Sequence, residues 1–570
     1  MTHSRSLDCV VIGYYEPPFD DYERLIRQYG ADSEAYRDLQ FSFVDLDGRR
    51  RNYVDLLNYA HQLAHRMPDG DRRHEPFKSG EIPNLAAVYL TNFLRNQGLR
   101  ARYVNLFLYE QERLLECLAQ NPYCVAITTT FYVLNSPVIE IVKFIRAHNP
   151  GVRIVVGGPL VANHRRNYRS EDTPIQVVTA AARRSGSREA ANDPFRSALE
   201  DMGADIYVCE GQGELTLARI VACLRDGGDL ASIPNLAFFD SGRLVVTPVV
   251  AENNSLDEHG IRWTRFADQR LGPTIQTRTA RSCAFNCSFC NYPRRAGKLT
   301  LASLDTIREE LDSMRELGDV QNVVFIDDTF NVPLPRFKDI CRMMIDRHYG
   351  FSWFSYLRCS NADAEAIELA AKSGCRGVFL GIESGSPSIL KNMNKAATVE
   401  KYAEGIRQLR DHGIITFASF ITGFPGETNA TVDETIDFIR THKPDYYRSQ
   451  LWYCEPGTPI DDQREKHAIQ GHGFVWSHRT MESLAAMDHI DRLFLSVTES
   501  AWLPQWSFDF WIIPYLLGKG ISVDGFSRFM GAADRMLALE IASVRPEEKH
   551  REQQAQLQAM TAVAAGWPVN

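Results

Sequence analysis

Three cysteines stand close together at the spacing Cys-x3-Cys-x2-Cys, at Cys283, Cys287 and Cys290. Thiolates this close along the chain can bind three irons of a single [4Fe–4S] cluster, which normally takes four cysteines. The iron left without a cysteine can bind a small molecule and pass it an electron, much as a catalytic metal site keeps one position open for the reacting species. The spacing therefore predicts a redox-active cluster with one open position.

Two other uses of these cysteines compete with the cluster. Cys287 and Cys290 alone could be half of a zinc site, but a structural zinc site needs four ligands and the chain has no second Cys-x2-Cys pair. The same two residues could be a redox-active dithiol, which would leave Cys283 unexplained. A cluster accounts for all three residues.

The cysteine segment resembles the cluster-binding loop of the radical S-adenosylmethionine (SAM) enzymes, and Phe289, just before the last cysteine, strengthens the resemblance. The resemblance implies that SAM binds at the open iron, with its adenine near the backbone around Phe289. It also implies that Glu383 and Ser384, in a Gly-x-Glu-Ser turn, contact the amino acid or ribose part of SAM. Arg358 is the expected partner of the SAM carboxylate, and Asp327 is a candidate support for SAM.

The elements that would position these residues form an alternating series of strands and helices from about residue 270. Six short apolar runs are the expected strands: 273–278, 323–327, 352–357, 377–381, 415–421 and 446–452. Six βα units make a partial (β/α)6 version of the eight-fold TIM barrel, whose chemistry lies at the carboxyl ends of the strands. The cysteine loop and the candidates Asp327, Arg358 and Glu383 each follow or end one of these runs, as that rule requires.

The first 210 residues hold a second alternating series. Its apolar runs are 7–12, 103–108, 124–128, 153–156 and 205–208, most of them rich in Val or Ile, and they predict a doubly wound, Rossmann-like α/β sheet. Such sheets bind ligands at the carboxyl ends of their strands. The candidate ligand contacts at these ends are Thr128, Thr129, Thr130, Gly157, Gly158, Glu210, Gly211, Gly213 and Glu214. Gly211-x-Gly213 lacks the third glycine of a dinucleotide motif, which favours a tight turn over a phosphate cradle.

These loops, in this order ahead of the cysteine motif, resemble the cobalamin-binding domain of cobalamin-dependent radical SAM enzymes. Many such domains carry an Asp-x-His-x-x-Gly motif whose histidine binds cobalt from below, and that motif is absent here. The resemblance therefore implies a cobalamin whose lower face is not held by this histidine. The absence also leaves open a degenerate domain that binds no cobalamin.

Two segments interrupt the first series, and a third follows the second one. Residues 14–80 are expected to be a long insertion, and residues 165–200, rich in Arg, Ser, Glu and Asp, a solvated excursion. Residues 461–570 are expected to be a helical domain that covers the barrel mouth and helps to enclose the substrate. The expected domains are thus 1–245, which binds cobalamin, 265–460, the radical SAM barrel, and 461–570.

Composition excludes some classes of protein. The chain has 570 residues and a formal charge of −9, which argues against nucleic acid as the main partner. No signal peptide and no stretch of 18 apolar residues is found, so no membrane association is expected. Twelve cysteines without paired spacing suit the reducing cytoplasm.

The leading hypothesis is a cobalamin-dependent radical SAM methyltransferase. Residues 473–481 and 11–14 resemble a narrower subgroup, the phosphinothricin-type P-methyltransferases and tryptophan C-methyltransferases, which implies methyl transfer to an unactivated carbon or phosphorus of a small molecule or peptide in natural-product biosynthesis. An external electron donor of the flavodoxin or ferredoxin type is also implied. Alternatives are a cobalamin-containing radical enzyme that rearranges, cyclises or oxidises its substrate, and a non-catalytic iron–sulfur or cobalamin-binding regulator. The substrate itself is not predicted.

Overall fold

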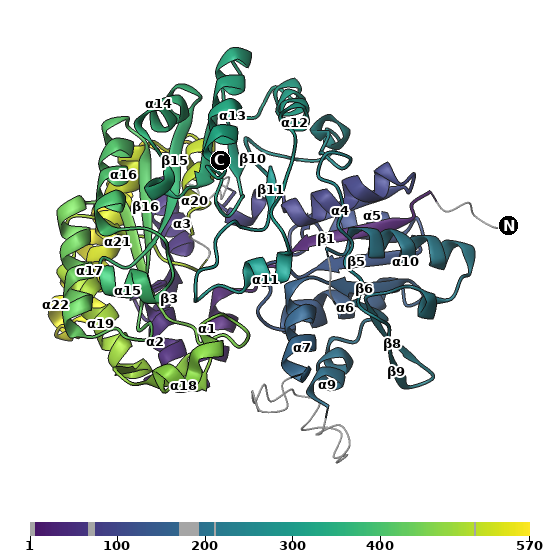
Figure 1. Cartoon of the computed structure of the whole chain (residues 1–570), viewed down its shortest axis with the longest axis horizontal. Helices are drawn as coiled ribbons and strands as arrows, with labels where there is room; N and C mark the ends of the chain where they lie inside the picture. Colours follow the sequence, from purple (N-terminus) through teal and green to yellow (C-terminus); the bar gives the residue numbers. More distant parts are fainter. Residues whose placement is uncertain (1–5, 66–74, 170–192, 210–211, 507–508, 570) are drawn as a thin grey trace. The chain divides into compact units, whose positions relative to one another are not determined.

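The computed structural model describes residues 6–65, 75–169, 193–209, 212–506 and 509–569 (Figure 1). The chain forms two compact units, each built from two separate stretches of sequence. Unit 1 comprises residues 1–17 and 83–266, and unit 2 comprises residues 18–82 and 267–570. Each unit is described by itself.

Unit 1 is a seven-stranded sheet in the order β4-β1-β5-β6-β7-β8-β9. Its parallel strands are β1 (Cys9–Tyr14), β4 (Ala101–Leu106), β5 (Cys124–Thr128), β6 (Arg153–Gly157) and β7 (Ile206–Val208). The antiparallel strands β8 (Leu236–Asp240) and β9 (Arg243–Val246) extend one edge. The five predicted strands are confirmed. The strand order reverses between β1 and β5, so the ligand-binding edge expected of an open parallel sheet lies at the carboxyl ends of these two strands.

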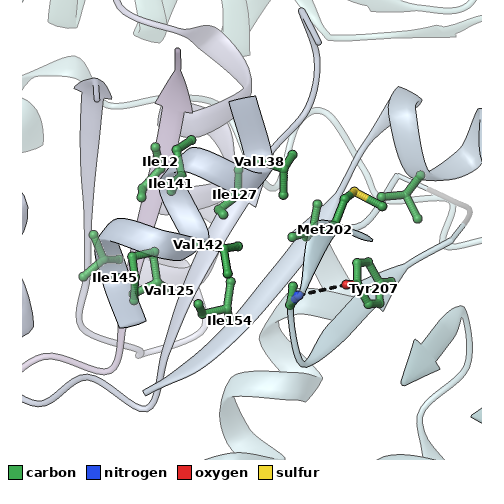
Figure 2. Packing of buried hydrophobic residues seen from close by; sticks show 14 of the residues in the cluster. Ile12, Val125, Ile127, Val138, Ile141, Val142, Ile145, Ile154, Met202 and Tyr207 are labelled. Carbon is green, nitrogen blue, oxygen red and sulfur yellow. Dashed lines mark hydrogen bonds between the residues drawn. The ribbon is translucent and has the colours of Figure 1, made fainter. Parts of the chain in front are cut away.

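Helices cover both faces of this sheet. On one face α6 (Ser136–His148) points Val138, Ile141, Val142 and Ile145, a stripe at helical spacing, toward Ile12, Val125, Ile127 and Ile154 of the strands (Figure 2). Helices α5 (Gln111–Leu118), α7 (Pro159–Arg169) and α9 (Pro194–Met202) contribute to the same core. On the other face α4 (Leu85–Asn96) lies so close to β1 that a Cβ on Gly13 would meet the Cβ of Asn84 at 2.8 Å. Helix α10 (Glu214–Asp226) packs on α4, which confirms the doubly wound sheet.

Unit 2 is a partial barrel of seven parallel strands in the order β10-β13-β14-β15-β16-β17-β21. The strands are β10 (Thr274–Thr277), β13 (Asn322–Phe325), β14 (Ser352–Tyr356), β15 (Cys375–Glu383), β16 (Ile415–Thr422), β17 (Tyr446–Leu451) and β21 (Ala501–Trp502). The longer helices between them are α12 (Leu304–Glu316), α13 (Leu334–Arg347), α14 (Ala364–Lys372), α15 (Pro387–Asn392), α16 (Val399–Asp411), α17 (Asn429–His442) and α19 (Ser483–Ser496). The six predicted strands are confirmed in the predicted order. Strand β21 was not predicted, because two residues carry no alternation pattern.

The segment 18–82 belongs to unit 2, although the sequence reads as an insertion in the first domain. It forms α1 (Phe19–Arg27), α2 (Glu34–Gln40), β2 (Phe43–Leu46), β3 (Arg49–Asn52) and α3 (Tyr53–Ala64). Its apolar side chains pack on the tail of the chain: the rings of Tyr22 and Trp506 stack at 3.8 Å. Trp502 Nε1 also donates a hydrogen bond to the carbonyl of Phe41 at 3.2 Å.

The tail itself is mainly helical, as expected, with α20 (Ile512–Gly518), α21 (Val523–Ile541) and α22 (Pro546–Ala564). A small sheet of β18 (Gln470–His472), β19 (Val475–His478) and β20 (Met481–Glu482) precedes them and was not predicted. Most of the predicted excursion 165–200 lies outside the described residues. No described helix combines the length and the apolar character needed to cross a bilayer.

Candidate functional site

The cysteine loop follows β10 and the short strand β11 (Ala280–Arg281), and two separate segments fix its backbone. The N–H of Ser288 donates to the carbonyl of Met393 at 2.8 Å, and its hydroxyl donates to the carbonyl of Asn392 at 3.0 Å. The N–H of Ile460, beyond β17, donates to the carbonyl of Ser288 at 2.8 Å. Asn394 Nδ2 donates to the carbonyl of Asn286 at 2.8 Å. The protein therefore holds this loop in place through its own hydrogen bonds.

The three thiols fit the ligand set of a cluster. All are free of disulfides, with Cys287 buried and Cys283 and Cys290 half-buried. Burial raises the pKa of Cys290 to about 11, and the nearby Cys287 and Cys283 add to the rise because the loop brings the sulfurs together. Among the described residues, no three His, Cys, Asp or Glu side chains form a site for a single metal ion. A cube places each thiolate on a different iron, so three cysteines of one loop can serve as its ligands.

Asp327 holds the start of the cysteine loop. It lies just beyond β13 and is 2% exposed. Its carboxylate accepts hydrogen bonds from the N–H of Thr279 at 2.6 Å, from the N–H of Ala280 at 2.9 Å and from the Thr279 hydroxyl. Burial raises its pKa, while these bonds oppose the rise. Its observed contacts are thus with the protein, and contact with SAM stays a prediction.

Arg358 lies two residues beyond β14, and its guanidinium is stacked on the cysteine loop. Its Cζ lies 3.7 Å from the ring centroid of Phe285. Asn331 fixes its backbone, accepting from the Arg358 N–H and donating to the Arg358 carbonyl, both at 2.9 Å. The residue is 5% exposed, yet Nε and Nη2 have no hydrogen-bond partner among the described residues. These two nitrogens share one edge of the guanidinium, the geometry that binds a carboxylate with two parallel hydrogen bonds.

Glu383 ends β15 in an unusual conformation and is paired. Its φ of 69° is rare outside glycine and curls the chain at the strand end. Its Oε1 accepts from Lys395 Nζ at 2.7 Å, and both side chains are buried. The Lys395 ammonium also lies 5.4 Å from the ring centroid of Phe289. The pair therefore connects the strand end to the predicted adenine-contacting residue.

Lys395 was not found from the sequence. It follows α15, far along the chain from the cysteines, and no motif marks it. Asn331 and Phe285 were missed for the same reason, since their roles depend on what Arg358 contacts in the fold. The only available signal was the position of Phe285 between two ligand cysteines.

The Ser384 side chain forms its hydrogen bonds within the protein. It is 1% exposed, its hydroxyl accepts from the N–H of Ser386 at 3.1 Å and lies 3.3 Å from the Thr435 hydroxyl of α17. The next residue must be glycine, because a Cβ on Gly385 would meet the Cα of Thr435 at 2.7 Å and the Cβ of Phe438 at 2.6 Å. The Glu-Ser-Gly turn thus packs against α17, and contact between Ser384 and SAM stays a prediction.

The turn after β16 makes room for a tryptophan. Gly423 has a φ of 92°, and a Cβ there would meet the Trp476 ring at 2.5 Å. The buried Glu427 carboxyl accepts hydrogen bonds from the N–H groups of Gly423 and Phe424. Burial raises its pKa to about 8. The buried carboxyl therefore holds this turn through two backbone N–H groups.

In unit 1, the loops after β5 and β6 come together. The N–H and hydroxyl of Thr129 both donate to the carbonyl of Gly157 at 2.9 Å. Gly158 has a φ of 109°, and a Cβ there would meet Thr129 Oγ1 at 2.9 Å. The hydroxyls of Thr128 and Thr130 lie 3.0 Å apart, with Thr130 exposed. Five of the predicted contacts therefore lie at one edge of the sheet, beside the point where strand order reverses.

The loop after β7 is closed by a different part of the chain. Gly213 has a φ of 81° and begins α10, whose Leu215 and Thr216 N–H groups donate to the Glu252 carboxylate at 2.9 Å. The Glu214 carboxylate accepts from Asn254 Nδ2 at 2.9 Å. This helix start is therefore occupied by the protein's own carboxylate. Glu210 and Gly211 lie outside the described residues.

Known proteins resemble part of the chain in sequence and most of it in fold. Residues 277–439, from the end of β10 to α17, match the Radical SAM superfamily. This stretch is a radical SAM domain. It holds all three cysteines together with Asp327, Arg358 and Glu383, so the predicted cluster and SAM residues lie within the matched domain.

Curated relatives match over about half of this chain. An uncharacterised methyltransferase of Pyrococcus horikoshii is 29% identical over 260 residues, which are 44% of this chain and 56% of the relative. An anaerobic magnesium-protoporphyrin IX monomethyl ester cyclase of Rubrivivax gelatinosus is 26% identical over 302 residues, 50% of this chain and 54% of the relative. The chain thus spans little more than half the length of these relatives.

Solved structures match over most of the chain. The radical SAM methyltransferase TsrM of Kitasatospora setae, solved with tryptophan and a SAM analogue, is 18% identical, has a TM-score of 0.52 and aligns over 86% of this chain and 98% of its own. The cobalamin-dependent radical SAM enzyme OxsB, solved with aqua-cobalamin, is 14% identical, has a TM-score of 0.56 and aligns over 85% of this chain and 82% of its own. These likenesses show a shared fold.

Proposed function

We propose that this chain is a cobalamin-dependent radical SAM methyltransferase that moves a methyl group from SAM to a carbon or phosphorus of a small molecule or peptide. The observation that carries the proposal is the unpartnered, buried edge of Arg358 beside the cysteine loop. In the proposal, the cluster and SAM supply one-electron chemistry and the methyl group, and cobalamin supplies a methyl carrier.

Arg358 is built to receive an anion. Leaving two N–H groups of a buried guanidinium without acceptors costs on the order of several kcal/mol, so the arrangement is stable only if something compensates it. Stacking on Phe285 provides part of that compensation. The carboxylate of an amino acid bound above the cysteines would satisfy both N–H groups at once. SAM carries such a carboxylate.

Glu383 and Lys395 supply both charges at the next strand end. Their buried pair, 2.7 Å apart, places an acceptor and a donor in the neighbourhood of Phe289. An ammonium or ribose hydroxyl can bind a Glu383 oxygen while Lys395 stays paired with the same carboxylate. The residues beside the cysteine loop therefore offer partners for the carboxylate, the ammonium and the ribose of SAM.

The cobalamin part of the proposal is supported by the edge of unit 1. Large apolar side chains are exposed in the loops after β4 and β5: Leu108, Tyr109, Phe131 and Val133 are 38%, 58%, 52% and 72% exposed. Exposed apolar groups gathered at a functional edge mark a binding surface. A corrin ring is large and flat, and the likeness in fold to cobalamin-dependent enzymes agrees with this choice.

The test is product analysis under anaerobic conditions with a chemical reductant. A methyltransferase converts SAM to S-adenosylhomocysteine when it methylates a substrate. Formation of 5′-deoxyadenosine alone would favour a second candidate, rearrangement or cyclisation, which the likeness to the monomethyl ester cyclase supports. A regulator would consume no SAM.

Spin resonance tests the cobalamin site separately. None of Thr128, Thr129, Thr130, Gly157 and Gly158 is a histidine, and the nearby His164 of α7 has its Nε2 2.8 Å from Asn135 Oδ1. The Co(II) form should therefore show no nitrogen superhyperfine splitting once its own dimethylbenzimidazole is displaced. Nitrogen splitting from the protein would contradict this arrangement.

A further inference from the structure

The interior of the partial barrel has an aromatic floor. The rings of Tyr356, Phe379 and Phe417, on β14, β15 and β16, lie side by side with centroids 4.8 Å apart in each neighbouring pair. Their positions are in register across the three strands. Phe510 lies within 6.2 Å of all three rings. Trp511 reaches Tyr356 at 5.3 Å, so the segment before α20 enters the barrel and forms one wall.

Part of this aromatic floor is accessible. Tyr356, Phe379 and Trp511 are partly exposed, whereas Val378 and Leu380, on the opposite face of β15, are 0% exposed. A complete small barrel packs its interior with side chains. Phe417 and Phe510 are 0% exposed, so the accessible part of the floor is formed by Tyr356, Phe379 and Trp511.

Arg448 on β17 stands above this floor and is fully bonded. Its Cζ lies 5.4 Å from the Phe417 ring centroid. Its Nε and Nη2 face the Gln450 side-chain amide, whose oxygen accepts at 2.9 and 3.1 Å when the amide is turned to satisfy the contact. Its Nη1 donates to Asp509 Oδ1 at 3.2 Å. With all three nitrogens engaged, Arg448 orients Asp509.

Asp509 retains an unused acceptor. Its Oδ1 accepts from Arg448 and from the N–H of Phe510, the latter at 2.7 Å, while Oδ2 has no hydrogen bond among the described residues. The side chain is 31% exposed and adjoins Trp511. A second carboxylate, Asp38 of α2, lies near Arg448 and accepts from the N–H of Leu451, with its pKa raised to about 6 by burial. Arg448 therefore interacts with acidic side chains from two segments, Asp509 through a hydrogen bond and Asp38 electrostatically.

We propose that Asp509 binds a protonated amine or ring N–H of the substrate, while Tyr356 and Trp511 contact the flat apolar part of the same molecule. Arg448 is a positioning residue that holds Asp509. A carboxylate beside aromatic faces is complementary to a positive or hydrogen-bond-donating nitrogen on an apolar body. The inference deepens the proposed function, on which the role of this ligand as methyl acceptor rests.

The test uses two ligands that share one ring system and differ in charge: tryptamine, a cation, and indole-3-propionate, an anion. Binding to the full chain, reconstituted with iron and sulfide under anaerobic conditions, is measured by calorimetry. The wild type should bind tryptamine about tenfold more tightly than the anion, the order of magnitude of a charged hydrogen bond. Equal binding, tighter binding of the anion, or no binding of either overturns the proposal without the need for a variant.

Asp509→Asn then assigns the preference to one residue. The amide oxygen can still accept from Phe510, so the variant keeps its local bond and loses only the charge. Tryptamine affinity should fall about tenfold, with the affinity for indole-3-propionate unchanged. The matched control is Asp433→Asn, which removes an aspartate paired with Arg492 on the exposed surface. An Asp509→Asn variant that keeps the preference, or a control that loses it, overturns the assignment.

The outcome is separable from that of the proposed function. Iron content and SAM affinity report on the cluster and SAM site in every variant. If the chain prefers the amine but forms no S-adenosylhomocysteine with any amine, the binding site is supported and the methyltransferase proposal is contradicted. If the chain forms S-adenosylhomocysteine but lacks the preference, the methyltransferase proposal is supported and the binding site is contradicted.

Discussion

The guanidinium of Arg358 lies 3.7 Å from the ring of Phe285, so the end of β14 and the cysteine loop touch through a cation and an aromatic face. Phe285 lies between Cys283 and Cys287. A substitution at Arg358 therefore alters the packing of the loop that would hold the cluster, and a shift of the loop alters the position of the Arg358 guanidinium.

Arg358→Met should weaken SAM binding by about tenfold to a hundredfold, because it removes the two unpartnered donors that fit a carboxylate. Arg358→Lys should recover little of this affinity, since an ammonium lacks the forked edge. SAM dissociation constants of the cluster-loaded proteins check both variants. Arg342→Met, which breaks exposed ion pairs on α13, is the control and should bind SAM normally. Normal SAM affinity in Arg358→Met would remove the observation on which the proposed function rests.

Cys287→Ala should abolish both the cluster absorbance and SAM turnover, because a cube held by two thiolates lacks a third protein ligand. Iron and acid-labile sulfide analysis after anaerobic reconstitution provides the measurement. Cys223→Ala, in unit 1, should keep full iron content. Full activity of the Cys287 variant would refute the cluster assignment.

The raised pKa of Glu427 predicts that the free energy of unfolding decreases as pH rises. Its pKa is about 8 in the folded chain, against about 4.3 in an unfolded one. Between these values the folded state keeps a proton that the unfolded state has lost, so the stabilisation is complete below about pH 4 and is lost as pH rises to about 8, by up to about 1.4 kcal/mol per pH unit.

Glu427→Gln removes this titration and keeps an oxygen for the Gly423 and Phe424 N–H groups. Thermal unfolding at pH 5.5 and pH 8.5 should therefore show a smaller decrease for the Gln variant than for the wild type. Parallel decreases in the two proteins would show that Glu427 is ionised in the folded chain.

Gly158→Ala tests the contact between the β5 and β6 strand ends. A side chain there is strained at a φ of 109° and would also meet Thr129 Oγ1 at 2.9 Å. Gly242→Ala is a control for strain alone, because Gly242 has a φ of 80° and open space around it. Both variants should unfold at a lower temperature, and only Gly158→Ala should lose affinity for hydroxocobalamin. Equal cobalamin binding by the two variants would show that this edge of the sheet does not bind the cofactor.

The strands of both sheets could be predicted because parallel strands are buried on both faces, so they appear as continuous apolar runs. The Val/Ile-rich runs of β1, β5 and β6 are examples. Positions at the carboxyl ends of barrel strands then predicted Arg358 and Glu383 as candidates. Arg358 contacts Phe285 of the cysteine loop and Glu383 pairs with Lys395, and contact of either residue with SAM stays a prediction.

What could not be predicted depends on contacts between residues distant in sequence. Lys395 is placed on Glu383 by the return of the chain after α15, and Asp509 is placed on Arg448 by a segment from the tail. The assignment of residues 18–82 to unit 2 depends on packing such as that of Tyr22 on Trp506. None of these pairings leaves a periodic pattern or motif along the chain.

The chain passes from unit 1 to unit 2 after residue 17, returns after residue 82 and leaves again after residue 266. No single truncation can therefore yield either unit intact. A fragment ending at residue 266 would carry the α1–α3 segment without the tail residues on which it packs, and one starting at residue 267 would expose Trp506 and Asp534, the partners of Tyr22 and Tyr53. To isolate unit 1, residues 18–82 must be excised and replaced by a short linker. To isolate unit 2, residues 18–82 must be fused to a fragment that starts at residue 267.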